Sequence, residues 1–142
     1  DGAAALALAT LEAVQSHNLP VRAHILGHSN YAQEPALFTT APVAAAQKLL
    51  DSLDWKVSDV DLWEVNEAFA VVPMAFMRDL DIPHDRVNIY GGACALGHPI
   101  GASGARIIVT LLNALEQTGK KRGVAAICIG GGEATAIAIE RP

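Results

Sequence analysis

The sequence GGACALGHPIGASGAR, residues 91–106, holds five glycines and one histidine within sixteen positions. Because glycine lacks a Cβ atom, this density lets the backbone approach another group closely. The spacing of its last three glycines does not fit a dinucleotide-binding loop, and no Lys followed by Ser or Thr completes a Walker A loop. What remains is one imidazole, His98, which stands before Pro99 and a predicted helix over 102–116. There it can act as a general base or as a hydrogen-bond donor.

A second glycine-rich stretch, AICIGGGEA at 126–134, follows an apolar run of strand length. Cys128 lies near the end of that predicted strand, where a thiol can face a substrate. Backbone N–H groups of the turn from Gly130 to Gly132 can point at a developing oxyanion, as acyl-transfer chemistry requires. A cysteine that ends a strand is nonetheless more often a small core residue.

The third stretch, WEVNEAFA at 63–70, places Asn66 between a predicted strand and a predicted helix. Asn66 can cap that helix or hold a water molecule. Taken singly, Asn66 is most simply a cap and His98 a structural turn residue. Cys94, flanked by alanines, is expected to be small and buried, with no role in chemistry.

The remaining pattern alternates helices and strands, which favours a mixed α/β layer structure. Residues 3–9 are compatible with a strand or with the start of a helix. Thr40 is suited to cap a helix with Pro42 in its first turn, and Pro73 is expected to kink a later helix about two turns in. The other predicted elements are a helix over 11–18, a strand from Val21, a strand over 60–65, and a terminal hairpin of 124–129 with 135–140.

Composition limits the possible functions of these 142 residues, which suit a single domain. The formal net charge is −5 and the basic residues are scattered apart from 120–122, so no basic stripe suits a nucleic-acid backbone. No segment offers the roughly 20 apolar residues of a membrane span. Two cysteines are too few for a disulfide framework, which favours a reducing compartment, the cytoplasm or an organelle matrix. The opening DGAAALALAT lacks Met, and we expect it to follow a longer upstream segment.

The three stretches indicate more together than each does singly. In their residues and in their order, NEAFA, then GGACALGHPIGASGAR, then CIGGG resemble the thiolase family. The resemblance spans essentially the whole chain. It implies a thiolase-like α/β fold, in which two related halves pack as layers of mixed sheet and helices. Residues 1–20 would be the tail of the N-terminal half, and residues 21–142 the C-terminal thiolase domain.

The resemblance also implies a role for each matched residue. His98 would activate a nucleophilic cysteine and, with a water held by Asn66, stabilise the enolate-like oxyanion of the incoming thioester. Cys128 would shuttle the α-proton, which needs a thiol pKa drawn below its free value of about 8.5. Gly130 would supply one backbone N–H of a second oxyanion hole. Ala68 and Phe69 would line the route of the pantetheine arm.

The implied activity is reversible acyl transfer and Claisen condensation between acyl-CoA thioesters, with thiolysis of a 3-oxoacyl-CoA as the reverse reaction. Coenzyme A would be a substrate, and no cofactor or metal is expected. Neither Cys94 nor Cys128 matches the family's nucleophile, which is therefore expected upstream of Asp1 in an N-terminal half. The implied assembly is a homodimer or homotetramer in the cytoplasm. Ala134 departs from a glycine common in the family, which bears on the local turn and on chain-length preference.

The sequence is compatible with two alternative functions. One is a ketoacyl synthase or a related condensing enzyme, which shares the fold but typically pairs its nucleophile with two histidines. Cys128 within CIGGG argues against it. The other is a non-catalytic module that binds coenzyme A or serves assembly, which a chain without the nucleophile could be.

Overall fold

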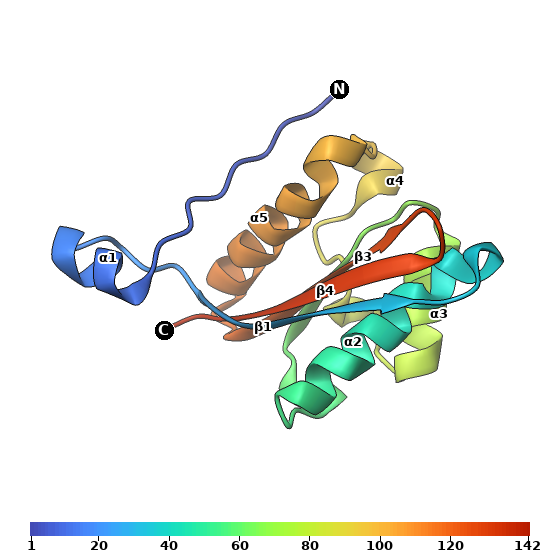
Figure 1. Cartoon of the computed structure of the whole chain (residues 1–142), viewed down its shortest axis with the longest axis horizontal. Helices are drawn as coiled ribbons and strands as arrows, with labels where there is room; N and C mark the ends of the chain where they lie inside the picture. Colours follow the sequence, from blue (N-terminus) through green and yellow to red (C-terminus); the bar gives the residue numbers. More distant parts are fainter.

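A four-stranded mixed sheet forms the centre of the computed structural model, which describes residues 1–142 (Figure 1). The strand order is β1-β4-β3-β2. β2 runs parallel to β3, whereas the pairs β1 with β4 and β3 with β4 are antiparallel. The expectation of a layered mixed α/β fold is confirmed. The strands are β1 (His24–Ala32), β2 (Leu62–Val65), β3 (Arg122–Ile129) and β4 (Glu133–Glu140).

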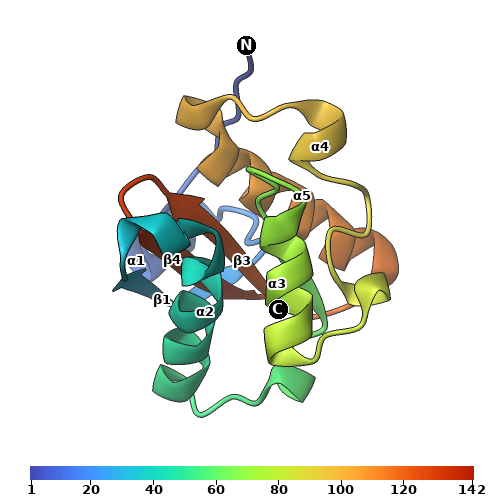
Figure 2. The same cartoon turned by 90° about the vertical axis from the view of Figure 1, so that its right-hand side faces the viewer.

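Helices cover both faces of this sheet (Figures 1 and 2). α2 (Ala41–Ser52) and α3 (Val71–Leu80) lie on one face, and α5 (Ile100–Thr118) lies on the other. The connecting elements are short: α1 (Leu11–His17), α4 (Ala93–Leu96) and the 3-10 turns η1 (Pro35–Thr40), η2 (Val57–Asp59) and η3 (His84–Arg86). None of the helices combines the length and the apolar character that crossing a bilayer requires.

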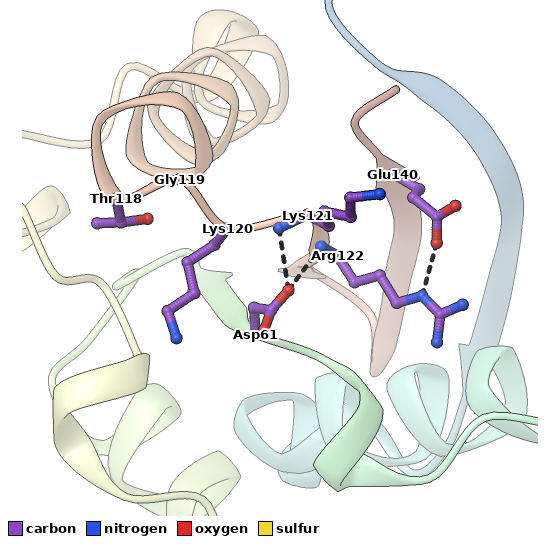
Figure 3. Close-up of a pocket in the computed structure, with 7 residues that line it drawn as sticks. All are labelled: Asp61, Thr118, Gly119, Lys120, Lys121, Arg122 and Glu140. Atoms are coloured by element: carbon purple, nitrogen blue, oxygen red, sulfur yellow. Dashed lines mark hydrogen bonds and ion pairs between the residues drawn. The ribbon is translucent and has the colours of Figure 1, made fainter.

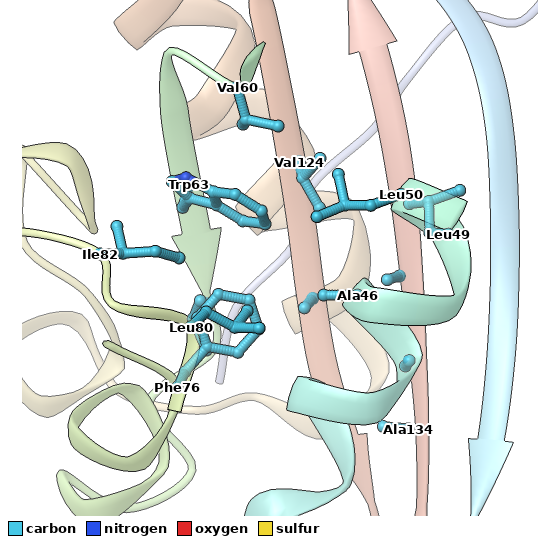
Figure 4. Packing of buried hydrophobic residues seen from close by; sticks show 14 of the residues in the cluster. Ala46, Leu49, Leu50, Val60, Trp63, Phe76, Leu80, Ile82, Val124 and Ala134 are labelled. Carbon is cyan, nitrogen blue, oxygen red and sulfur yellow. The ribbon is translucent and has the colours of Figure 1, made fainter. Parts of the chain in front are cut away.

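The hydrophobic core is divided by the sheet into two clusters. The larger holds 19 buried residues between the sheet and the pair α2 and α3, where Trp63 packs edge-on against Phe76 with ring centroids 5.4 Å apart (Figure 4). The smaller holds 8 buried residues against α5, including Leu111. A Cβ added at Gly123 would lie 2.8 Å from the Leu111 side chain, so this glycine lets α5 pack tightly on β3.

Strand periodicity assigns the residues of β3 to these two clusters. Val124, Ala126 and Cys128 belong to the larger cluster, while Ala125 belongs to the smaller one. Side chains on a strand alternate between faces, so this segment is apolar on both sides because both of its faces are covered. Cys128 therefore points toward the α2 and α3 side of the sheet.

Several predicted elements are confirmed with small shifts in their ends. α1 begins after Thr10, whose hydroxyl accepts a hydrogen bond from the backbone N–H of Ala13 at 3.2 Å, and ends at Asn18 in the left-handed conformation. The terminal hairpin is β3 and β4, and α5 begins two residues before its predicted start. Residues 3–9 form neither a helix nor a strand.

Two predictions about helix ends are wrong. Thr40 precedes α2 but caps nothing with its side chain, because its hydroxyl donates to the carbonyl oxygen of Leu37 in the preceding turn. Pro73 does not kink α3, since this helix begins at Val71 rather than at Asn66. Pro73 thus lies in the first turn, where backbone N–H groups lack helical acceptors in any case.

Candidate active site

The parallel strands β2 and β3 end at the same edge of the sheet, and Asn66 lies there. Its backbone N–H donates to the carbonyl oxygen of Ala126 at 2.9 Å, which extends the ladder one residue past β2. The side chain is 0% exposed, and neither its Oδ1 nor its Nδ2 makes a hydrogen bond to the protein. Asn66 is not the helix cap that the sequence suggested, because α3 begins five residues later, after Ala70. A buried amide without protein partners is costly, which favours a bound ligand or water as its partner.

Cys128 is the penultimate residue of β3 and lies opposite Ala134. Only 8% of the residue is exposed. Burial raises the pKa of its thiol, and no charged group of this chain opposes that effect. The expectation of a lowered pKa is therefore wrong for the chain by itself. Ala134 is buried within this strand pair.

His98 stands between α4 and α5, and its ring orientation is set by Ser103 in the first turn of α5. Its Nδ1 lies 2.6 Å from the Ser103 hydroxyl oxygen, and that hydroxyl donates to the carbonyl oxygen of Pro99 at 3.1 Å. A hydroxyl has one hydrogen to donate, so Ser103 then accepts from Nδ1. This hydrogen-bond network assigns the imidazole proton to Nδ1 and leaves Nε2 able to accept a proton.

The other residues singled out from the sequence lie near these segments. Gly130 is exposed in the turn between β3 and β4, and its N–H donates to no group of the chain. Ala68 is half-buried against the larger core cluster. Phe69 is 59% exposed and meets Phe38 edge-on, with ring centroids 6.1 Å apart. The N–H of Gly130 and the ring of Phe69 are thus free to contact a ligand.

A polar clamp joins the NEAFA segment to the glycine-rich loop. Oε2 of Glu67 accepts a hydrogen bond from the backbone N–H of Cys94 at 2.9 Å, and Oε1 accepts one from Nδ2 of Asn88 at 2.8 Å. Partial burial alone would raise the pKa of Glu67, but these two donors hold its pKa below the usual range. A Cβ at Gly92 would collide with the Glu67 carboxylate, so the clamp requires glycine there. Cys94 is exposed, which corrects the expectation that it is buried.

A buried ion pair crosses from β2, the strand that precedes the NEAFA segment, to α5. Nη1 of Arg106 lies 2.9 Å from Oε1 of Glu64, and their side chains are 17% and 2% exposed. Burial raises the pKa of Glu64 to about 7 even though Arg106 opposes that shift. β2 and the NEAFA segment that follows it are therefore bonded to α5, to the glycine-rich loop and to β3. No hydrogen bond joins the side chains of His98, Cys128 and Asn66 to one another.

Sequence reasoning missed five residues that hold this region together: Glu64, Glu67, Asn88, Ser103 and Arg106. A signal was present for two of them. Glu64 is the only charged residue inside β2, and Arg106 is the only Lys or Arg between Arg86 and Lys120. A lone acid and a lone base within apolar elements indicate a buried pair, because an unpaired buried charge is strongly destabilising.

Two cavities differ in their relation to these residues. A polar cleft of about 640 Å³ is lined by no hydrophobic residue and lies where β2 and β3 begin, opposite the edge that holds Asn66 (Figure 3). Its lining residues are Asp61, Thr118, Gly119, Lys120, Lys121, Arg122 and Glu140. A smaller cavity of about 270 Å³ is lined by α3 together with Glu67, Asn88 and Cys94. The clamp thus borders the smaller cavity, and the larger cleft is remote from the candidate site.

Known proteins resemble this chain in sequence and in structure. Residues 19–141 match the family model described as thiolase, C-terminal domain. The chain is 55% identical to an acetyl-CoA acetyltransferase of Synechocystis sp. over 141 residues, which is 99% of the chain but 36% of that relative. It is 47% identical to a beta-ketoadipyl-CoA thiolase of Pseudomonas knackmussii over 143 residues, with the same two coverages. The chain therefore spans about a third of the length of these relatives.

Two solved structures cover nearly the whole chain. The Acat5 thiolase of Ascaris suum in complex with coenzyme A matches with a TM-score of 0.89 and 48% identity, over 94% of this chain and 35% of that one. The human mitochondrial 3-ketoacyl-CoA thiolase matches with a TM-score of 0.91 and 40% identity, over 94% and 34%. The family model matches residues 19–141, and the solved thiolase structures share the fold of this chain. The chain belongs to the thiolase family, as a C-terminal domain of that family.

Proposed function

We propose that this chain is the C-terminal part of an enzyme that catalyses reversible acyl transfer and Claisen condensation between acyl-CoA thioesters. The observation that carries the proposal is Asn66, whose fully buried amide has no protein partner at the edge where β3 leads to Cys128. Such an amide suits a water or a thioester oxygen. The relatives are named as acetyl-CoA acetyltransferases and thiolases, and one related structure is a complex with coenzyme A.

In the proposed reaction, an upstream cysteine thiolate attacks the carbonyl carbon of an acyl-CoA, and the coenzyme A thiol leaves. Nε2 of His98 takes the proton of that cysteine, since Ser103 keeps the proton on Nδ1. Cys128 then accepts the α-proton of a second acyl-CoA, and the carbanion so formed attacks the carbonyl carbon of the acyl-enzyme and releases the upstream cysteine as a thiolate. His98 and a water held by Asn66 donate hydrogen bonds to the enolate-like oxygen. The N–H of Gly130 donates one to the second oxyanion.

The raised pKa of Cys128 favours its role as a proton donor. A thiol that is largely protonated at neutral pH is ready to donate a proton, which thiolysis requires. To act as the base of condensation, it needs a positive partner outside this chain, because this chain supplies none. The proposed N-terminal half is the natural source of that charge.

The wider setting is also a proposal. Phe69 and Ala68, beside the candidate site, would contact the pantetheine arm, and coenzyme A would be a substrate. Homodimers or homotetramers are the proposed assembly. Cytoplasmic localisation is supported by one rat relative named as cytosolic, whereas one related human structure is named as mitochondrial.

The full-length protein tests this function directly. We expect it to cleave acetoacetyl-CoA when free coenzyme A is supplied, and we expect residues 1–142 alone to give no turnover. Cys128→Ala should abolish condensation and leave acyl-enzyme formation detectable by mass spectrometry, whereas His98→Ala should damage both half-reactions. Cys94→Ala is the matched control for loss of a thiol. An inactive full-length protein that still binds coenzyme A would instead support a non-catalytic module.

A further inference from the structure

Arg106 leaves one of its donors unused in a buried position. Its Nη1 meets Oε1 of Glu64 at 2.9 Å and the hydroxyl of Thr110 at 3.4 Å. Its Nη2 is buried and donates to no group of the chain. A guanidinium carries donors only, so whatever completes this site must offer an acceptor.

Asn66 is the first residue after β2, the strand that carries Glu64. It follows Glu64 by two residues, and its N–H continues the ladder to Ala126, so strand alternation carries its side chain toward the face that Glu64 occupies. The pKa of Glu67, the residue directly after Asn66, is raised by burial and lowered mainly by its hydrogen bonds, with a smaller lowering from the charge of Arg106. Arg106 thus bonds to the carboxylate two residues before Asn66 and acts electrostatically on the carboxylate directly after it.

We propose that Arg106 is a positioning residue that sets the orientation of the Asn66 amide, an inference that rests on the proposed function. The unused Nη2 donates to a bridging water molecule, which in turn donates to Oδ1 of Asn66. Oδ1 is the only acceptor of that amide, and a water that accepts a hydrogen bond from a guanidinium is polarised to donate to such an acceptor. With Oδ1 directed inward, Nδ2 faces the substrate and donates to the water that stabilises the oxyanion. Glu64 fixes the guanidinium in place through the bond at 2.9 Å.

The test measures the two half-reactions of the full-length protein separately. Arg106→Met should slow the formation of acetoacetyl-CoA between roughly tenfold and a hundredfold, because a misdirected donor no longer meets the developing charge. Acyl-enzyme formation from acetyl-CoA should change less than about twofold, since it does not use Asn66. Removal of one partner from a buried ion pair can prevent folding. Arg106→Lys therefore serves as a second variant: it keeps the charge but cannot span Glu64 and Asn66, and should show the same selective loss.

A double-mutant cycle separates positioning from a general structural role. In an Asn66→Ala background, Arg106→Met or Arg106→Lys should cause no further loss of condensation rate, because the amide that it orients is absent. Arg122→Met breaks the pair with Glu140 at the remote edge of the sheet and should leave both half-reactions unchanged.

The possible failures are distinguishable. Additive losses in the cycle, or equal losses in both half-reactions, would overturn the positioning role and leave the proposed function standing. A full-length protein that neither cleaves acetoacetyl-CoA nor forms it would overturn both proposals, as would unchanged condensation in Asn66→Ala.

Discussion

The side chain of Asn88 forms a pair of hydrogen bonds with the backbone of Val65, 23 residues earlier in the chain. Its Oδ1 accepts from the N–H of Val65 at 2.8 Å, and its Nδ2 donates to the carbonyl oxygen of Val65 at 2.8 Å. Val65 pairs with Ala126 on its other side, so the side chain of Asn88 takes the place of a neighbouring strand. The backbone N–H and carbonyl groups of Val65, at the end of β2 next to Asn66, thus have hydrogen-bond partners.

Replacement of Asn88 with alanine should lower the free energy of unfolding of the full-length protein by on the order of 3 kcal/mol, because two partly buried backbone groups lose their partners. Chemical denaturation monitored by tryptophan fluorescence measures this loss. Asn113→Ala, at an exposed position of α5, is the matched control and should change stability by less than about 0.5 kcal/mol. Equal effects of the two substitutions would contradict the proposed structural role of Asn88.

Ser103→Ala should lower kcat by roughly tenfold or more, because His98 loses the acceptor that fixes its tautomer and ring orientation. Both half-reactions should be affected, as the proposed role of His98 spans both. Steady-state kinetics of the full-length protein, together with mass spectrometry of the acyl-enzyme, provide the measurement. Ser52→Ala removes a hydroxyl that bonds only a carbonyl of its own helix, and should retain activity. Normal turnover in Ser103→Ala would show that His98 is oriented by another group.

Gly92→Ala should destabilise the full-length protein by roughly 1–3 kcal/mol, since the new Cβ would overlap the carboxylate of Glu67. The backbone of Gly92 is extended, so alanine adds no strain of its own. In a Glu67→Ala background the space is open, and the same substitution should cost much less. Thermal unfolding of the four proteins in this cycle gives the coupling, and strictly additive losses would argue against the overlap.

The pH dependence of stability should carry a contribution from Glu64. Burial raises the pKa of Glu64 to about 7, against the opposing charge of Arg106 and with the like charge of Glu67 nearby. The folded state therefore binds the Glu64 proton more tightly than the unfolded state does. The stability from this group is fully present below its ordinary pKa and is lost as pH rises through 7.

Glu64→Gln removes that titration. The free energy of unfolding of the unmodified full-length protein, minus that of the variant, should fall between about pH 4.5 and pH 7 and stay level above about pH 8. Urea titrations of both proteins across this range supply the difference. If the difference rose with pH instead, the Arg106 charge would outweigh the burial of Glu64.

The sequence alone determined which segments fold locally and which family the chain resembles. The order of NEAFA, the glycine-rich loop around His98, and CIGGG pointed to the C-terminal part of a thiolase, and the family match over 19–141 agrees. The helix over 11–18 and the terminal hairpin were also predicted, because caps, apolar runs and glycine turns act within a few residues.

Only the tertiary structure decided how Asn66, Glu64 and Ser103 are used. Asn66 resembles a helix cap in the sequence, but the ladder to Ala126 extends the strand, and α3 begins at Val71. The bond from Arg106 to Glu64 spans 42 positions, and that from Cys94 to Glu67 spans 27. Such pairings depend on which elements pack against each other, and local propensity carries no information about distant partners. Burial and long-range hydrogen bonds, rather than residue type, therefore distinguish a buried amide without a protein partner from an ordinary cap.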